Sequence, residues 1–134
     1  MALVLDASAL VYAIRSPAAS ATRLRRRLAQ ETSHAPQLID AELGNVLRRH
    51  VLAGALPASD AKTLLSAGAT LVDLRYETSE ALRGGAWELR DSLSFYDALY
   101  VALARALDLS LLTADAKLAR TPKLPCAVEL AASA

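Results

Sequence analysis

Four acidic side chains occupy positions where the surrounding sequence is apolar. Asp6 ends the run that begins "ALVL", and Asp115 ends "LSLLTAD". Asp97 lies in "SFYDALYVALA", and Glu42 lies in "LIDAELGNVL". A carboxylate in an apolar setting needs hydrogen bonds, a charge partner or a ligand, because burying an unpaired charge is costly. These four residues are therefore the first candidates for chemistry.

The expected topology brings these acids to one edge of a sheet. Ligands bind at the carboxyl ends of the strands in an open parallel sheet, and Asp6 and Asp115 both follow expected strands. Asp97 lies in the first turn of a helix whose start points toward that edge, and Glu42 borders the apolar stripe of its helix. Carboxylates that lie close together raise one another's pKa, and a divalent cation relieves this repulsion. Because these residues offer only oxygen ligands, we expect the bound cation to be a hard ion, either Mg²⁺ or Mn²⁺.

A purely structural interpretation is open for each acid. Asp6 and Asp115 are placed to cap the helices that follow them. Ser94 and Asp97 fit the capping pattern [ST]-x-x-[DE], and Glu42 fits an ordinary acid on a helix surface. Each interpretation accounts for one acid, but none of them explains why all four should converge.

Two hydroxyl side chains accompany the acids at the strand ends. Ser8 follows Asp6 by two residues, and Thr113 precedes Asp115 by two residues. We expect these hydroxyls to orient a carboxylate or a metal-bound water, because groups around a metal site fix the orientation of its ligands.

The elements that must position these residues alternate between strands and helices. A helix is expected to start at Ser16-Pro17, and Gly68 is expected to end another. The apolar runs and breakers predict strands at 2–5, 70–74, 109–115 and 126–130, a brief extended segment at 33–35, and helices at 8–14, 18–31, 37–53, 57–68, 79–90, 95–107 and 116–120. This alternation predicts right-handed crossovers and a mainly parallel sheet between helical layers, so the fold class is α/β.

Length and composition predict one domain with an aliphatic core. The chain has 134 residues, of which 54% are hydrophobic and 4% aromatic, so Ala, Leu and Val must fill the core. The apolar excess hints at an interface with a partner. We expect residues 1–130 to form the domain and residues 131–134 to be a frayed tail.

Net charge, cysteine content and hydrophobic run length limit the partners and the compartment that we expect for the protein. The formal net charge of +1 argues neither for nor against a polyanionic partner. One cysteine excludes an internal disulfide, and no stretch of about 18 apolar residues is present to cross a membrane. We therefore expect a cytoplasmic protein that makes no membrane contact.

The stretches around the four acids resemble those of a known family. "LVLDASAL", "LIDAELGNVLRR", "SFYDALYVALARAL" and "LLTADAKLA" look like the signature stretches of PIN-domain ribonucleases, in particular the VapC toxins of type II toxin–antitoxin pairs. The similarity runs from residue 3 to about residue 130, with the order of the motifs preserved. It implies a PIN-like three-layer α/β/α fold with a central sheet of four to five strands.

The resemblance also assigns roles to individual residues. It implies that the catalytic, metal-binding acids are Asp6, Glu42, Asp97 and Asp115, supported by Thr113 and Ser8. Lys117 stands where some family members carry a further acid, which puts a second, fully occupied metal site in doubt.

The implied activity is that of an Mg²⁺-dependent endoribonuclease that leaves a 5′-phosphate and a 3′-hydroxyl. The resemblance further implies a homodimer that acts as a toxin and is neutralised by a cognate antitoxin. A housekeeping RNA-processing nuclease and a catalytically silent PIN-like interaction module are the alternatives. A phosphoacceptor receiver module also has an acidic Mg²⁺ pocket, but it needs adjacent acids after its first strand, and Asp6 stands alone.

Basic and aromatic residues are candidates for holding RNA. Arginine forks bind phosphate well, so we expect contributions from Arg25, Arg26, Arg48 and Arg49, although a solvated helix face explains them equally well. Neither His34 nor His50 has a motif around it, so we expect both to be surface or packing residues. Tyr100 is expected to pack in the core.

Overall fold

The central element is a parallel sheet of five strands. The structure is a computed structural model and describes residues 1–131. The strand order is β3-β2-β1-β4-β5, and every neighbouring pair is parallel. The strands are β1 (Ala2–Leu5), β2 (Thr32–Pro36), β3 (Leu74–Tyr76), β4 (Leu111–Thr113) and β5 (Val128–Leu130). The predicted α/β class and the predicted number of strands are confirmed.

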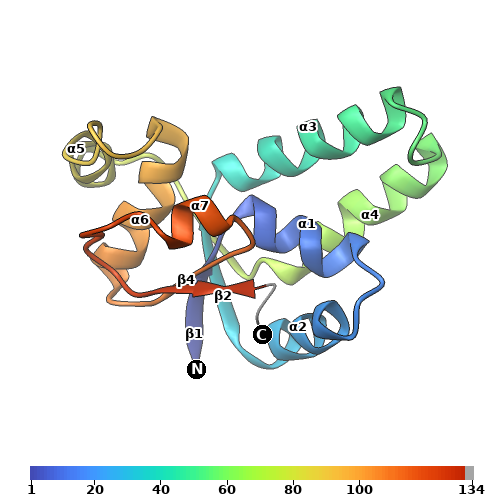
Figure 1. Ribbon diagram of the computed structural model, residues 1–134, viewed down its shortest axis with the longest axis horizontal. Helices are drawn as coiled ribbons and strands as arrows, with labels where there is room; N and C mark the ends of the chain where they lie inside the picture. The colour runs from blue at the N-terminus through green and yellow to red at the C-terminus, as the bar shows by residue number, and fades with distance from the viewer. Residues whose placement is uncertain (132–134) are drawn as a thin grey trace.

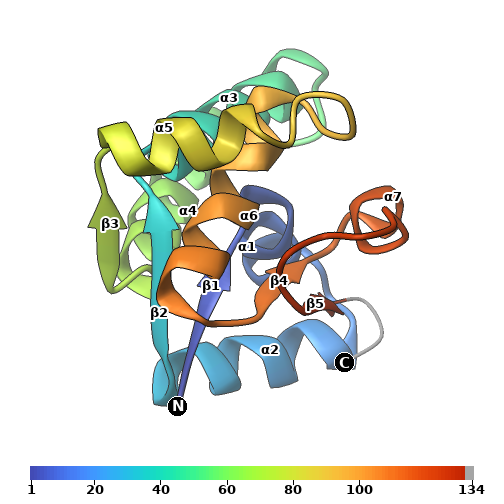
Figure 2. The ribbon, with the colours of Figure 1, turned by 90° about the vertical axis from the view of Figure 1, so that its left-hand side faces the viewer.

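Helices cover both faces of this sheet (Figures 1 and 2). The helices are α1 (Ala7–Arg15), α2 (Ala19–Gln30), α3 (Leu38–Leu52), α4 (Ala58–Leu71), α5 (Glu80–Trp87), α6 (Phe95–Leu107) and α7 (Ala116–Ala119). On one face α6 packs against the central strands and α5 packs on α6, whereas α1, α2, α3 and α4 pack together on the other face. The short helix α7 lies beside β4 and β5. None of the helices described has both the length and the apolar character that crossing a membrane requires.

The core is built from the central strand and one central helix. Leu3, Val4 and Leu5 of β1 are all buried, as expected for a strand covered on both faces. Seven consecutive residues of α6, from 98 to 104, are buried as well. A helix that is apolar all round belongs inside a domain, and its alanines let it approach the sheet closely. This helix carries Asp97 in its first turn, so the packing of α6 fixes the position of that carboxylate.

The predicted strand at 70–74 is wrong, because α4 continues to Leu71 and β3 begins at Leu74. Gly68 does not end the helix. A Cβ atom at this position would lie 2.6 Å from Cδ2 of Leu43, so the glycine allows α4 to pack closely against α3. The chain turns into the sheet at Asp73, whose Oδ2 accepts a hydrogen bond from the backbone N–H of Ser33 in β2 at 2.8 Å.

Two smaller expectations are also corrected. Ser16 ends α1 instead of starting α2, since its N–H donates to the carbonyl of Tyr12 and α2 begins only at Ala19. Ala131, which was expected in a frayed tail, is fully buried against the core. The rest of that expected tail, residues 132–134, lies outside the described residues.

Candidate active site

Asp6 lies at the carboxyl end of β1, directly before α1. Its Oδ1 accepts hydrogen bonds from the hydroxyl of Ser8 at 2.7 Å and from the N–H of Ala9 at 2.9 Å, so Asp6 does cap α1. The side chain is nonetheless buried, with only 5% of the residue exposed. Burial raises the pKa of Asp6 to about 6, against the hydrogen bonds that favour its charged form. The capping interpretation is therefore correct but leaves the carboxylate short of a charge partner.

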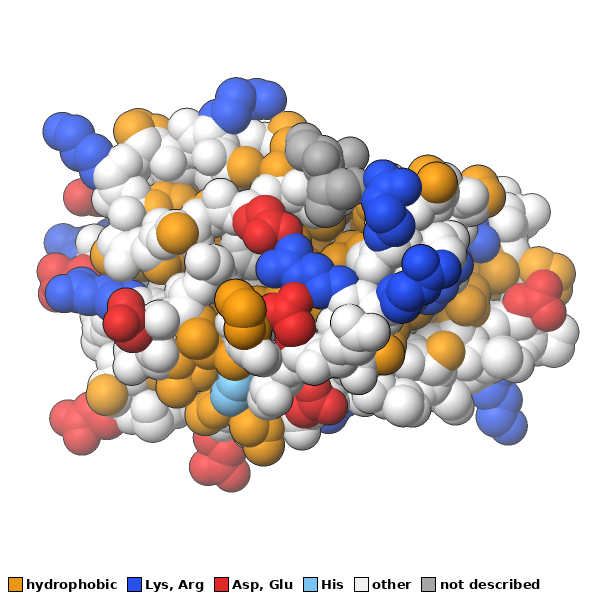
Figure 3. All heavy atoms as spheres, turned by 90° about the horizontal axis from the view of Figure 1, so that it is seen from below, with side chains coloured by type: hydrophobic (Ala, Val, Ile, Leu, Met, Phe, Trp, Pro, Cys, Tyr) orange, Lys and Arg blue, Asp and Glu red, His pale blue; other side chains and the backbone are white. Residues whose placement is uncertain are grey.

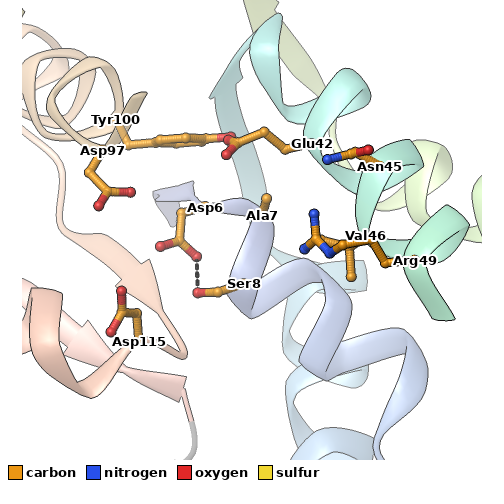
Figure 4. A pocket seen from close by; sticks show the side chains of 10 residues that line it. All are labelled: Asp6, Ala7, Ser8, Glu42, Asn45, Val46, Arg49, Asp97, Tyr100 and Asp115. Atoms are coloured by element: carbon orange, nitrogen blue, oxygen red, sulfur yellow. Dashed lines mark hydrogen bonds between the residues drawn. The ribbon is translucent and has the colours of Figure 1, made fainter. Parts of the chain in front are cut away.

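All four predicted acids line one pocket (Figure 4). Asp6 comes from the end of β1, Glu42 from α3, Asp97 from the first turn of α6, and Asp115 from the N-cap of α7. The pocket has a volume of about 220 Å³, and its remaining lining residues are Ala7, Ser8, Asn45, Val46, Arg49 and Tyr100. The convergence expected from the topology is thus present in the fold.

Hydroxyl groups link the two strand ends that carry Asp6 and Asp115. The strands β1 and β4 are neighbours, and the N–H of Asp6 donates to the carbonyl of Leu112 at 3.1 Å. The hydroxyls of Ser8 and Thr113 lie 3.1 Å apart, and the N–H of Asp115 donates to Oγ1 of Thr113 at 3.0 Å. Thr113 is fully buried. Ser8 and Thr113 therefore hold the loop after β4 against the start of α1.

Glu42 meets a tyrosine from the opposite face of the sheet. The hydroxyl of Tyr100 donates a hydrogen bond to Oε1 of Glu42 at 2.6 Å. Burial raises the pKa of Glu42, the hydrogen bond from Tyr100 lowers it, and the charge of Asp97 raises it again. Burial and the neighbouring Glu42 also raise the pKa of Tyr100 far above its usual range, so this phenol stays a donor.

Tyr100 was expected only to pack, and its polar role was missed. The available signal was its spacing, because Tyr100 follows Asp97 by three residues and so shares a helix face with it. Its ring is buried, as expected, but its hydroxyl reaches the pocket.

Asp97 and Asp115 are both helix-start residues that face the pocket. The N–H of Asp97 donates to Oγ of Ser94, which confirms the predicted cap. Oδ1 of Asp115 accepts from the N–H groups of Lys117 and Leu118. Burial raises the pKa of Asp97, the charge of Asp115 raises it further, and Ser94 and the charge of Lys117 lower it. Lys117, which departs from the pattern of some relatives, thus partly offsets the negative charge of the site.

The donor chemistry of the pocket fits a hard divalent cation. Its potential ligands are carboxylate oxygens, and burial, with a smaller contribution from neighbouring carboxylates, raises the pKa values of Asp6, Glu42 and Asp97. Within residues 1–131, no three Asp, Glu, His or Cys side chains lie close enough together to hold a metal ion as they stand. An open arrangement suits Mg²⁺, which keeps several waters and takes one or two carboxylates from a protein.

The four predicted RNA-binding arginines fall in different places. Arg49 lines the acidic pocket, whereas Arg48 lines a separate groove between α3 and α4 with Leu52 and Leu65. Arg25 donates to the carbonyl of Ala13 at 2.5 Å and to Oγ1 of Thr22 at 3.0 Å, so it ties α2 to α1.

Arg25 and Arg26 belong to α2, which lies near the start of β1 (Figures 1 and 2), away from the strand ends that carry the acids. Seen from below, this end of the molecule has acidic side chains among its basic ones (Figure 3). Its basic character is therefore interrupted, and the RNA-binding role of Arg25 and Arg26 stays a prediction.

Comparison with known proteins decides the family. A family model described as PIN domain matches residues 3–124. The chain belongs to the PIN-domain family. Ribonuclease VapC1 of Mycobacterium tuberculosis is 48% identical over 127 residues, which cover 95% of this chain and 96% of that protein. Ribonuclease VapC9 of the same organism is 37% identical over 126 residues, covering 94% and 95%. The relatives that this PIN domain resembles in sequence are thus VapC proteins.

Solved structures agree with this PIN domain in fold. VapBC2 from Rickettsia felis, bound to a DNA fragment from its promoter, superposes with a TM-score of 0.72 at 19% identity and covers 97% of this chain and 98% of that chain. VapC20 of Mycobacterium tuberculosis, a toxin that cleaves the sarcin-ricin loop, superposes with a TM-score of 0.65 at 17% identity, covering 93% and 98%. The three-layer PIN-like architecture expected from the sequence is confirmed.

Proposed function

We propose that this PIN domain is a metal-dependent endoribonuclease and the toxin of a toxin–antitoxin pair. The observation that carries the proposal is the convergence of Asp6, Glu42, Asp97 and Asp115 on one pocket at the carboxyl ends of β1 and β4. The names of its VapC relatives support RNA as the substrate. We place its action in the cytoplasm, with Mg²⁺ as the ion and Mn²⁺ as a substitute.

Each acid has a part in this proposal. Asp6, Asp97 and Asp115 hold the ion, and Glu42 either binds it or positions a water. A bound divalent ion supplies a water of lowered pKa and neutralises the charge that develops on the phosphate. Tyr100 orients Glu42 through the hydrogen bond at 2.6 Å, and Ser8 holds Oδ1 of Asp6 at 2.7 Å. Both contacts turn the carboxylates toward the pocket before substrate arrives.

The reaction is hydrolysis of an RNA phosphodiester. Water attacks the phosphorus, and the bond from phosphorus to the 3′ oxygen breaks. That oxygen takes a proton and leaves as a 3′-hydroxyl, so the other product carries a 5′-phosphate. A histidine-based mechanism has no support in this pocket, whose described lining residues include no histidine.

A protein partner is the second part of the proposal. The groove between α3 and α4 is lined by Val51, Leu52 and Leu65, and Leu52 is 68% exposed. An apolar groove that also carries exposed leucines is typical of an interface. We propose a cognate antitoxin and a homodimer as partners, which the apolar excess of the sequence and the toxin–antitoxin complexes among its structural neighbours support.

The test is RNA cleavage by the purified chain, freed from any partner. Labelled structured and unstructured RNAs are incubated with Mg²⁺, Mn²⁺ or EDTA. We expect cleavage with either ion, none in EDTA, and a loss of about 100-fold or more in Asp97→Asn, because a ligand of the ion is removed. Asp91→Asn, which changes an exposed acid outside the pocket, is the matched control and should cleave like the wild type. Equal cleavage in EDTA, or by Asp97→Asn, would refute the proposal.

A further inference from the structure

A second hollow adjoins the acidic pocket, and two of its lining side chains, Arg15 and His50, are basic. Its lining residues are Ser8, Val11, Tyr12, Arg15, Ser16, His50 and Ala114, and its volume is about 420 Å³. Ser8 lines both hollows, and Ala114 directly precedes Asp115 in the chain. The two hollows therefore adjoin at Ser8, at the start of α1.

Two nitrogen atoms in this second hollow lack partners. Within residues 1–131, Nε of Arg15 and Nδ1 of His50 are shielded from solvent and make no hydrogen bond. Buried polar groups are nearly always paired, so an orphan calls for an explanation. Both of these atoms belong to side chains that line the same hollow, although Arg15 comes from α1 and His50 from α3. A polar ligand in the hollow would supply the missing partners once these side chains turn toward it.

No acid of the chain neutralises Arg15 in the described structure. The ion pairs found among residues 1–131 use Arg27 and Arg75. Asp60 lines a neighbouring hollow together with Arg15, but it forms none of these pairs. A guanidinium with free donors matches the oxygens of a phosphate, which it binds with two parallel hydrogen bonds.

The position of Arg15 suits a strand that passes through the acidic pocket. Ser8 and Arg15 are seven residues apart on α1, which is about 10 Å along the helix axis. Arg49 lines the acidic pocket and the next residue, His50, lines the second hollow, and α1 and α3 lie side by side (Figure 1). Arg49 and Arg15 thus place positive charge on both hollows, where α1 and α3 lie together. A negatively charged strand needs such a track, because the acids themselves repel it.

We propose that Arg15 and His50 form a subsite for a phosphate of the RNA strand, beside the phosphate that is cleaved. This inference rests on the proposed function and deepens it, since it names the residues that hold the substrate backbone. Neither was expected to bind RNA from the sequence, which pointed to Arg25, Arg26, Arg48 and Arg49 and gave His50 as a surface or packing residue.

The first test is RNA binding in EDTA, where cleavage is off, measured by fluorescence anisotropy of a short single-stranded RNA. Arg15→Ala should weaken binding by about 10- to 100-fold, because hydrogen bonds to charged groups are lost. It should also reduce the slope of log affinity against log salt by about 0.7, the value for one phosphate contact on a single strand. His50→Gln should weaken binding less, and Arg83→Ala, which changes an exposed arginine of α5 that lines neither hollow, is the matched control with wild-type binding.

Two further readouts separate a substrate role from a structural one. In cleavage assays Arg15→Ala should raise KM by a similar factor and change kcat by less than about 3-fold. The reason is that the lost contact binds the substrate and the transition state equally. Its melting temperature should equal or exceed that of the wild type, because an unpaired buried donor is removed. A lowered melting temperature with unchanged KM would assign Arg15 to the fold and overturn the inference.

The outcomes also distinguish this inference from the proposed function. If Arg15→Ala cleaves and binds RNA like the wild type, with unchanged KM, the subsite is overturned and the proposed nuclease activity stands. Binding that depends on Arg15 without any cleavage in Mg²⁺ supports the subsite and refutes the nuclease. No binding of RNA by the wild type overturns the subsite. If Arg15→Ala weakens only the complex with the antitoxin, the hollow serves a protein partner, and the RNA subsite is overturned.

Discussion

Removing the charge of Asp6 should stabilise the metal-free protein. Asp6 is 5% exposed, and burial raises its pKa from the ordinary value of 3.8 to about 6. A difference of about 2 in pKa corresponds to about 3 kcal/mol between the charged and neutral forms. Because the pKa is raised in the folded state, folding favours the protonated acid. The penalty is absent below about pH 4, grows between pH 4 and 6, and is complete above pH 6.

The substitution Asp6→Asn removes this penalty and keeps most of the local contacts. An asparagine oxygen can still accept from Ser8 and Ala9, as Oδ1 of Asp6 does. The new NH₂ group of the asparagine lacks an acceptor, and burying it unpaired reduces the gain in stability by about 1 kcal/mol. We therefore expect the free energy of unfolding to rise by about 1–2 kcal/mol at pH 7.5 and the melting temperature by on the order of 5 °C.

The assay is thermal and urea unfolding in EDTA at pH 7.5 and pH 4, with Asp91→Asn as the exposed control. The gain of Asp6→Asn should vanish at pH 4, where the wild-type acid is protonated. Added Mg²⁺ should then stabilise the wild type more than the variant, because a ligand that binds only the folded state shifts the equilibrium toward it. An Asp6→Asn variant that is less stable than the wild type in EDTA at pH 7.5 would refute this account of the pocket.

Two further variants test the support of the site and the packing of the fold. Tyr100→Phe removes the hydrogen bond that lowers the pKa of Glu42, so we expect cleavage to fall by about 3- to 10-fold and the acidic limb of the pH profile to move to higher pH. An unchanged profile would contradict the role of Tyr100. Gly68→Ala places a Cβ 2.6 Å from Cδ2 of Leu43 and should lower the free energy of unfolding by about 1–3 kcal/mol. Gly84→Ala, a helical position with nothing within 4 Å, should instead raise it by about 0.5–1 kcal/mol in the same urea titration; equal effects of the two would argue against close packing at Gly68.

The strand-end acids were predictable because their sequence context is local. Asp6 directly follows a buried strand, and Asp115 follows the strand that pairs with it. The rule that ligands bind at the carboxyl ends of parallel strands is then enough to bring them together. Glu42 and Asp97 were predictable from their positions in apolar helices, and these helices approach that edge from opposite faces of the sheet.

Features that depend on tertiary contacts were not predictable. Gly68 resembles a helix stop, but the close approach of Leu43 makes it a packing position inside α4. The basic run in α2 resembles a phosphate-binding patch, yet Arg25 bonds to Ala13, and Arg27 pairs with Glu31 and Glu129. The spacing of Tyr100 from Asp97 places it on the helix face toward the site, but its partner Glu42 is 58 positions away, so the pairing itself is not visible in the local sequence.

The central claim, that the four acids form a metal centre, is tested most directly by Mn²⁺ binding measured by electron paramagnetic resonance. Wild type, Asp97→Asn and Asp91→Asn are compared in the absence of RNA. We expect the wild type and Asp91→Asn to bind Mn²⁺ alike, and Asp97→Asn to bind it at least about 10-fold more weakly, since losing a charged ligand contact removes 1.4 kcal/mol or more (~10-fold). Equal binding by all three proteins would contradict the claim and return Asp97 to a role in capping α6.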